Sequence, residues 1–327
     1  MKVTKSGGTF FLKRLVWAVF VMGWVSLVAF GLMSLCPGDF LSSLRANPDL
    51  SADYIRTMEV KFGLDRPWIV QYVKWLGEGL RLNFGYSWTY QMPVLDLVGQ
   101  RLGSTLILSL VSLTLSWGMA IPLGLAAAVW RNTWWDRWIG GLSYVFLSIP
   151  EFFLALLAVF FAAQTGWFPT SGRTSLTYDF LSPVGRCWDS LWHLFLPASV
   201  LGLSNVARLL RLTRGYVLDF LRAEFVTAAR AKGVSEVRII LRHVLPNALS
   251  PLITHFGFAL AGLLSGSLLV ENVFNYPGLG QLLFEAFISQ DQFVVMASIV
   301  AGGAMLMFGN LVADLLLMGV DPRIRGK

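Results

Sequence analysis

The sequence predicts an all-α integral membrane protein with six transmembrane helices, a long loop after the first of them, and a helical elbow outside the membrane. Of its 327 residues, 55% are hydrophobic and only 14% are charged. A soluble protein of this length carries roughly 25% charged residues. Several apolar stretches are long enough to cross a bilayer, which takes about 20 residues in a helix. Because a spanning backbone must satisfy its own hydrogen bonds, these stretches are expected to be helices.

Six apolar stretches qualify, or nearly qualify, as spans. The third of them carries Pro150 and Glu151 near its centre. The long segment between the first two spans holds amphipathic patterns at 51–62 and 67–80, which predict two helices in an external loop. The six predicted spans cover residues 15–35, 106–130, 138–163, 194–210, 251–270 and 293–320.

Charge sets the predicted orientation of the spans. The N-terminus, the turn between spans two and three, the segment between spans four and five, and the C-terminal tail each carry a net positive charge. All four lie on one side, and positively charged loops face the cytoplasm, so both termini are expected there. The chain is expected to divide into an N-terminal helix with its external loop at 1–103 and a five-helix core at 104–327, which includes a basic segment at 219–246.

Motifs that would carry catalysis do not occur in the sequence. It holds no GxxxxGK[ST] phosphate cradle, no GxSxG and no HExxH. The three histidines are scattered along the chain, so no metal site is predicted and no catalytic residue is assigned. Cys36 and Cys187 form no CxxC pattern, and the sequence leaves open whether they pair.

The basic segment is longer and more polar than a connection between two spans requires. Helix formers fill its first half and predict one helix from Phe220 to Lys232, and Gly233 then suits the left-handed position that ends it. Ser235 can cap a second helix, which is expected to end at Leu245 because Pro246 disfavours continuation. The expected product is an elbow of two helices. Composition leaves two interpretations open: a basic helix that lies on anionic lipid, and a helix that docks on a protein.

The spacing of small and turn-forming residues in this segment resembles the EAA loop of ABC importer permeases. Ala228 and Ala229 are followed by Gly233, and then by Leu245 and Pro246. The fuller strings EFVTAARAKG and RHVLPNAL are similar to the branch of that family that imports dipeptides, oligopeptides and nickel. Shorter matches to the branch cover nearly the whole chain, at 37–39, 62–67, 84–87, 276–280 and 321–325.

The resemblance implies a type I ABC importer permease, in which the elbow is a coupling helix that seats on a cytoplasmic ATPase. It implies as partners a second homologous permease subunit, two ATPase subunits, an external substrate-binding protein and the lipid bilayer, and no nucleic acid. ATP and magnesium are expected on the ATPase subunits, so no cofactor is expected on this chain. The residues expected to couple to the ATPase are Glu224, Phe225, Ala228, Ala229, Arg230, Lys232, Gly233, Leu245 and Pro246.

Such a permease, in the cytoplasmic (inner) membrane of a bacterium, would move peptides or related small solutes into the cytoplasm by alternating access. The resemblance leaves open the solute, since relatives carry nickel, glutathione or oligosaccharides, and whether the permease pair is a homodimer or a heterodimer. The alternative from another class is a secondary transporter driven by an ion gradient, which would carry inverted repeats. The sequence shows no internal repeat, and that alternative leaves the elbow unexplained.

Charged residues inside the predicted spans give two further expectations. Glu151 is a candidate for the translocation path, because an acid within a membrane is a functional candidate by default. A hydrogen-bonded acid buried between spans is the equal alternative. Arg208, Arg211 and Arg214 recur at every third residue, and we expect them to reach lipid phosphate or the ATPase rather than to sense voltage.

Overall fold

The computed structural model describes residues 4–35, 41, 45, 51–63, 65–87 and 89–320. Two compact units make up the chain. The first holds Met1–Thr105 and Pro277–Met305, and the second holds Leu106–Tyr276 and Leu306–Lys327. The division expected from the sequence, with a boundary after residue 103, remains a prediction.

The first unit is mainly helical and includes both helices predicted in the long loop. Ser51 caps the first of them by accepting a hydrogen bond from the backbone N–H of Tyr54, and Gly63 ends it with a φ of 70°. A two-stranded antiparallel hairpin and one further helix were not predicted. The elements are α1 (Thr4–Leu35), α3 (Ala52–Phe62), α4 (Trp68–Gly79), β1 (Tyr86–Ser87), β2 (Met92–Pro93), α12 (Leu279–Ile288), and the first parts of α5 (Val94–Val129) and α13 (Gln292–Val320).

An aromatic cluster holds α4 against α1. Phe30, Tyr72, Trp75 and Met296 are buried together. The hydroxyl of Tyr72 also lies 2.9 Å from the Oγ atom of Ser26. The loop that follows the first span is therefore folded back onto that span by both apolar and polar contacts.

Polar contacts fix the hairpin against α12 and the start of α13. The Oγ atom of Ser87 donates a hydrogen bond of 2.7 Å to Asp291, which is 2% exposed. The Tyr90 hydroxyl donates to Glu285. Burial and this hydrogen bond raise the pKa of Tyr90 above its usual value. Because buried polar groups are costly when unpaired, these contacts specify one register for the hairpin.

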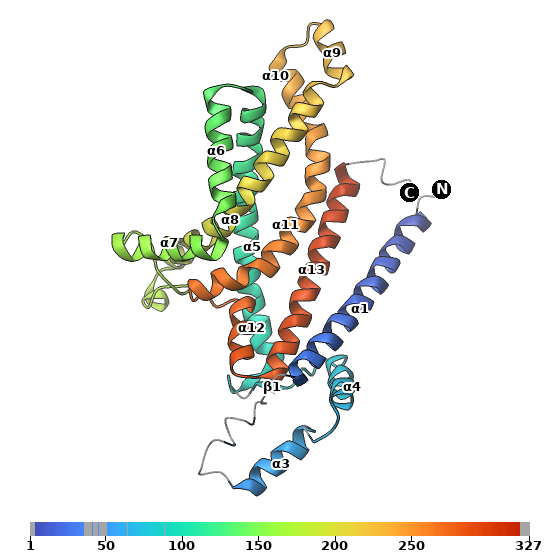
Figure 1. Ribbon diagram of the computed structural model, residues 1–327, viewed down its shortest axis with the longest axis vertical. Coiled ribbons are helices and arrows are strands. Elements are labelled where there is room, and N and C mark those ends of the chain that lie inside the picture. The colour runs from blue at the N-terminus through green and yellow to red at the C-terminus, as the bar shows by residue number, and fades with distance from the viewer. Residues whose placement is uncertain are drawn as a thin grey trace. The chain divides into compact units, whose positions relative to one another are not determined.

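The second unit is a helical bundle around one long helix, α8 (Figure 1). This helix packs against α6, α7 and α11. The elements of the second unit are the remainder of α5, α6 (Trp134–Ser148), α7 (Glu151–Thr165), the short helix η1 (Tyr178–Phe180), α8 (Pro183–Leu221), α9 (Glu224–Ala231), α10 (Glu236–Ile239), the π-helical turn η2 (Ile240–Val244), α11 (Leu245–Val273) and the end of α13.

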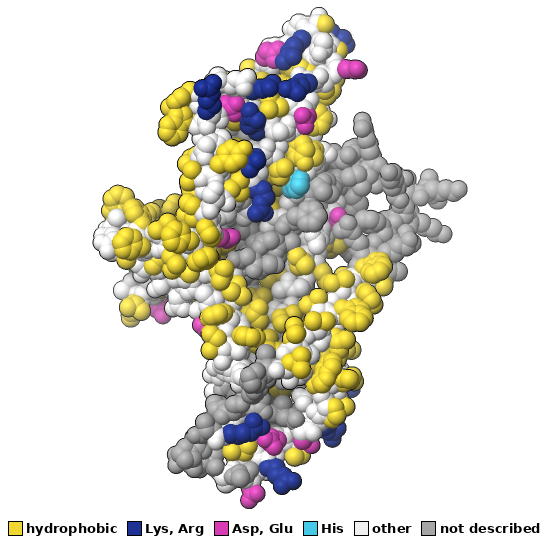
Figure 2. Space-filling view, in the orientation of Figure 1, with side chains coloured by type: hydrophobic (Ala, Val, Ile, Leu, Met, Phe, Trp, Pro, Cys, Tyr) yellow, Lys and Arg dark blue, Asp and Glu magenta, His cyan; other side chains and the backbone are white. Residues whose placement is uncertain are grey.

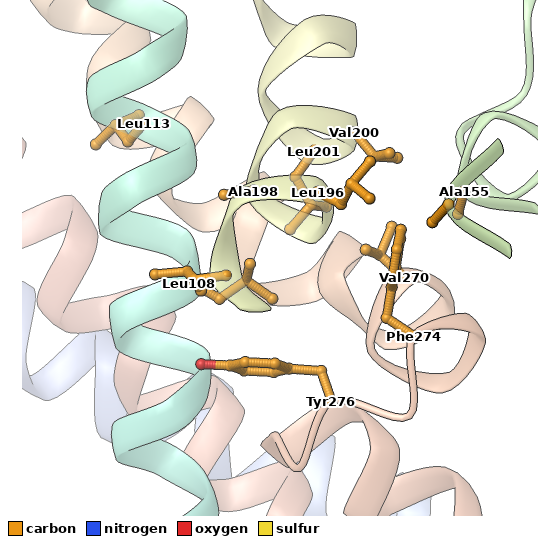
Figure 3. Close-up of a cluster of buried hydrophobic side chains, with 12 residues drawn as sticks. Leu108, Leu113, Ala155, Leu196, Ala198, Val200, Leu201, Val270, Phe274 and Tyr276 are labelled. Atoms are coloured by element: carbon orange, nitrogen blue, oxygen red, sulfur yellow. The ribbon is translucent and has the colours of Figure 1, made fainter. Parts of the chain in front are cut away.

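The largest apolar cluster of this unit joins α5, α7, α8 and the end of α11 (Figure 3). Leu108, Leu201 and Phe274 are among its buried members. Figure 3 shows the ring of Tyr276 extended toward α5, close to Leu108. Burial raises the pKa of Tyr276 to about 12, so its hydroxyl stays protonated at neutral pH. Because lipid tails are as apolar as these side chains, the cluster stabilises the bundle through close van der Waals packing and not through removal of apolar surface from water.

Within the described residues, four helices are long and apolar enough to cross a membrane. They are α1 over Val16–Leu35, α5, α8, and α13 over Gln292–Val312. The α6–α7 pair would make a fifth span that is bent by 99°. The predicted span at 251–270 lies within α11, where most of the side chains at 257–266 fall outside the described residues.

The third predicted span, 138–163, is not one continuous helix. Pro150 is the N-cap residue of α7, and Ile149 before it is extended, with φ −88° and ψ 121°. The proline ring disfavours helical backbone at the preceding residue, so the helix stops at Ser148 and restarts in a new direction. Glu151 therefore lies in the first turn of α7 and not in the middle of a straight span.

Gly124 allows α5 to approach α8 at backbone distance. A Cβ atom on this glycine would lie 2.7 Å from the Cβ atom of Thr213 and 2.8 Å from the carbonyl oxygen of Leu210. Nearby on the same interface, the Oγ atom of Ser116 lies 3.1 Å from the carbonyl oxygen of Gly202 and donates to it. Small residues at such crossings are the usual means of close helix packing in membranes.

Substituting Gly124 with alanine is therefore expected to destabilise the protein by about 1–3 kcal/mol, because the carbonyl of Leu210 belongs to the backbone and cannot move aside cheaply. Thermal unfolding of the purified protein in one detergent measures the effect. Gly118→Ala on the same helix is the matched control, since a Cβ atom there meets nothing within 4 Å. Equal melting temperatures for both variants would contradict the proposed close approach.

Candidate functional site

The elbow, residues 222–246, connects α8 to α11 at the end of both helices (Figure 1). The sequence predicted one helix from Phe220 to Lys232, and this is wrong at its start. Phe220 belongs to α8, which ends at Leu221. The helical backbone is interrupted at Arg222 and Ala223, and Ala223 is extended with ψ 149°. The first elbow helix is therefore α9 alone, which begins at Glu224.

Gly233 ends α9 in the left-handed conformation that the sequence predicts, with a φ of 77°. Its backbone N–H donates to the carbonyl of Arg230 at 2.9 Å, and the N–H of Val234 donates to that of Ala229 at 3.2 Å. These two bonds form a Schellman motif, which satisfies carbonyls that the helix end would leave unpaired. A left-handed backbone strongly favours glycine, because other residues there bring Cβ close to a carbonyl oxygen.

Pro246 does not end the second elbow helix, contrary to the prediction. α10, η2 and α11 follow one another without a break, and the backbone N–H of Leu245 donates to the carbonyl of Ile240 across the wide spacing of a π-turn. The wider turn makes room for the proline ring, which would clash with a carbonyl in a regular α-helix. Ser235 is the N-cap residue of α10, but its side chain makes no capping hydrogen bond.

The inner face of the elbow is anchored by an apolar cluster. Val226 of α9, Ile239 of α10 and Val244 of η2 are each fully buried. They pack with residues from α5, α8 and α11, namely Ala128, Val217 and Ala248. The elbow is therefore packed against three long helices of the second unit at once.

The outer face of the elbow exposes apolar side chains beside charges. Phe225 is 39% exposed, Val237 is 67% exposed and Leu241 is 54% exposed. Ala228 is exposed as well. Exposed apolar side chains on a polar tip are a feature of surfaces that bind another protein.

An ion pair clamps α9 to α10 across the turn at Gly233. The Arg230 guanidinium donates to Glu236 from Nε at 2.7 Å and from Nη2 at 3.1 Å. These hydrogen bonds lower the pKa of the Glu236 carboxyl and raise that of Arg230. Both side chains are about half exposed, so the pair fixes geometry more than it adds stability.

The residues predicted to couple to an ATPase fall on two faces of the elbow. Ala229 is half-buried against the anchoring cluster, and Leu245 is partly buried. Val237 and Leu241 are also exposed apolar residues of the elbow, and they were not among the predicted residues. The predicted residues that lie exposed are Glu224, Phe225, Ala228, Arg230, Lys232, Gly233 and Pro246.

Glu151 and the arginines of α8 have partners within the second unit. Glu151 is half-buried in the first turn of α7, where a helix N-terminus favours a negative charge, and it lies within electrostatic range of Arg208. Arg211 stacks on the ring of Tyr144 with 4.5 Å between its Cζ atom and the ring centroid. Whether Glu151 lines a translocation path remains a prediction.

Arg214 forms a two-point ion pair with Asp136, which joins α8 to α6. The Nε and Nη2 atoms of Arg214 lie 2.7 Å and 2.9 Å from the two carboxylate oxygens. The backbone N–H of Asn132 also donates to Asp136 at 2.9 Å. The expectation that Arg214 reaches lipid or a partner subunit is therefore wrong, because its hydrogen bonds are made within the bundle.

Cys187 is exposed and forms no disulfide with a described residue. Cys36 lies outside the described residues, so the pairing of the two remains open. The C-terminal match at 321–325 also lies outside them.

The structure is thus a bundle of long helices with a polar elbow anchored on it. The chain belongs to the family described as binding-protein-dependent transport system inner membrane component, whose model matches residues 120–326. A model of the N-terminal part of such membrane components matches residues 8–110. The protein is thus a multi-pass inner-membrane permease, not an enzyme, and it works with a substrate-binding protein and an ATPase.

Curated relatives match over nearly their whole length. The oligopeptide transport system permease protein AppB of Bacillus subtilis is 37% identical over 96% of this chain and 98% of its own. A putative peptide transport system permease protein of Brucella abortus is 35% identical over the same shares. A probable peptide ABC transporter permease protein of Sinorhizobium fredii is 35% identical over 97% of this chain and 99% of its own.

The fold also resembles a solved structure of the MetNI methionine ABC transporter in an inward-facing conformation. The match has a TM-score of 0.57 at 19% sequence identity, and it covers 69% of this chain and 97% of that one. The likeness confirms the predicted fold of a type I importer permease.

Proposed function

We propose that this chain is the permease subunit of an ATP-driven importer that moves peptides or related small solutes into the cytoplasm by alternating access. The observation that carries the proposal is the elbow, which exposes apolar side chains outward while its inner face is fixed to three spanning helices. The peptide transport permeases to which the chain is similar support peptides as the class of solute.

In the proposed assembly, a second homologous permease completes the pathway, and two cytoplasmic ATPase subunits supply the motor. An external binding protein delivers the solute. Both termini and the elbow face the cytoplasm, in line with the positive charge of those segments. ATP and magnesium are held by the ATPase subunits, and this chain binds no cofactor of its own.

The elbow acts as a rigid lever in this proposal. To move an outward–inward equilibrium from 1:99 to 99:1, the motor must favour one state by about 5.5 kcal/mol. Phe225 and Ala228 on the exposed face of α9 would insert into the ATPase, and Glu224, Arg230 and Lys232 would contact the rim of that site. Gly233 shapes the turn, while Ala229 and Leu245, which face inward, would pass the movement to the spans.

Glu151 is proposed to face the translocation path, where its carboxylate would meet a cationic group of the solute. Its position at the break between α6 and α7 supports this role, since irregular backbone at membrane depth is tolerated where it lines a cavity or is buried in protein.

Reconstitution of the complete transporter into vesicles tests the proposed function. Uptake of a labelled peptide is expected to require ATP, the ATPase subunits and the binding protein together. Vesicles without ATP but with a proton or sodium gradient are the control. Gradient-driven uptake by this chain alone would contradict the proposal and favour a secondary transporter.

A further inference from the structure

A basic cavity of about 1000 Å³ lies between α6 and α8 in the second unit. Its walls come from residues 136–147 of α6 and residues 208–215 of α8, with His255 of α11 at one side. On the face drawn in Figure 2, Lys and Arg side chains gather in a column over these helices. The cavity is separate from the exposed face of the elbow, none of whose proposed coupling residues lines it.

The positive charge of this cavity is not balanced by its own walls. Four arginines line it, Arg137, Arg208, Arg211 and Arg214, against the single carboxylate of Asp136, a net charge of +3. Asp136 is committed to Arg214 through both oxygens. Among the described residues, none of the other three arginines forms an ion pair, although Glu151 lies within electrostatic range of Arg208. The lining is thus suited to an anion with more than one negative oxygen.

Three glycines line the cavity, and the backbone conformation does not require glycine at any of them. Gly140, Gly141 and Gly215 line it, and a Cβ atom on any of them would meet nothing within 4 Å. None of the three has a positive φ, so no turn requires glycine at these positions. Larger residues would fit the fold and fill the space.

The surroundings of the cavity place it at the edge of a bilayer. Trp134, Trp135 and Trp138 at the start of α6 are each more than half exposed and pack on one another. Such aromatic clusters sit at the level of lipid headgroups. Further along α6, Leu142 and Val145 are exposed apolar residues that acyl chains could cover. Arginines that point into a cavity beside a headgroup layer have phosphate as their nearest available anion.

We infer that this cavity is a binding site for the headgroup of an anionic phospholipid, with Arg208 and Arg211 holding its phosphate oxygens. Arg137 adds a further positive charge to the lining, and the Asp136–Arg214 ion pair forms part of one wall. A headgroup with two phosphates, as in cardiolipin, suits the volume and the charge of the lining.

The complete transporter, purified and exchanged into nanodiscs of phosphatidylcholine with or without cardiolipin, provides the test. Native mass spectrometry counts the cardiolipin molecules that stay bound, and a cardiolipin titration gives their affinity. Arg208→Gln with Arg211→Gln is expected to weaken binding by about 25-fold, since each basic residue near anionic lipid contributes about fivefold. Gly141→Leu with Gly215→Leu keeps every charge but narrows the cavity, and it is expected to weaken binding by tenfold or more, about 1.4 kcal/mol.

Arg222→Gln with Arg238→Gln is the matched control, because both residues are exposed arginines outside the cavity, and it should bind cardiolipin as the parent does. Equal retention by all variants would show only lipids of the annular belt and would overturn the inference. If inorganic phosphate occupied the cavity as fully as cardiolipin does, the site would not be specific for lipid. Binding of a peptide that depends on its free C-terminal carboxylate, without binding of cardiolipin, would assign the cavity to the solute and also overturn the inference.

Discussion

Replacing Gly233 with valine is expected to lower ATP-driven uptake by about tenfold or more while the protein still inserts and assembles. Gly233 has a φ of 77°, and a residue with a branched side chain is strained there by about 1–2 kcal/mol. A strain of that size lowers the equilibrium constant for forming the native turn by about tenfold. The exposed face of α9 would then lose its orientation relative to α10. Uptake and solute-stimulated ATP hydrolysis, measured in the same vesicles, report the loss of coupling.

Gly233→Asn separates backbone strain from steric blocking. Asparagine tolerates the left-handed conformation, and a Cβ atom at this position meets nothing within 4 Å in the chain. The asparagine variant should therefore retain most of the uptake. Loss of uptake in both the valine and the asparagine variants would mean that a partner subunit occupies the space beside Gly233. Normal uptake and normal stimulated hydrolysis in both would refute the role of the turn in coupling.

Asp136→Ala is expected to destabilise the second unit by about 2–3 kcal/mol. The substitution leaves the Arg214 guanidinium without its two-point partner between α6 and α8. Removing one member of a buried ion pair costs about 3–5 kcal/mol. Because the Arg214 side chain is 32% exposed and water can solvate its charge, the expected cost is at or below the lower end of that range. Thermal unfolding of the complex measures the change.

Asp219→Asn is the control for this prediction, because Asp219 is an exposed acid near the end of the same helix α8. It should shift the melting temperature little. The double variant Asp136→Ala with Arg214→Leu is expected to recover part of the lost stability, since the unpaired charge is removed. No recovery in the double variant would show that α6 and α8 are held by packing alone.

Features that depend on neighbouring residues in the chain were predictable from the sequence. The apolar stretches at 15–35, 106–130, 194–210 and 293–320 predicted four helices that are long and apolar enough to span a membrane. Gly233 after a run of helix formers predicted the turn at the end of α9. The order and spacing of the short motifs predicted the family, which the matches over residues 8–110 and 120–326 confirm. Helix periodicity and turn chemistry are local properties, so a single sequence carries them.

Pro150 and Pro246 show that local sequence rules do not by themselves predict whether a helix ends at a proline. Pro150 breaks the third span by 99°, whereas Pro246 lies in a helix that continues through a π-turn. The rule that a proline disfavours helix at the preceding residue is the same in both cases. The outcome differs because the residues before Pro246 can widen into a π-turn while Val244 stays buried in the anchoring cluster.

By itself, the sequence determined a polytopic permease with an elbow shaped at Gly233. Only the tertiary structure decided which way each elbow residue faces, with Ala228 outward and Ala229 against the bundle. It alone paired Asp136 with Arg214, 78 positions apart, and so left the neighbouring arginines to line a cavity. Such pairings depend on how helices cross, and crossings are fixed by contacts between distant segments such as Gly124 against Thr213.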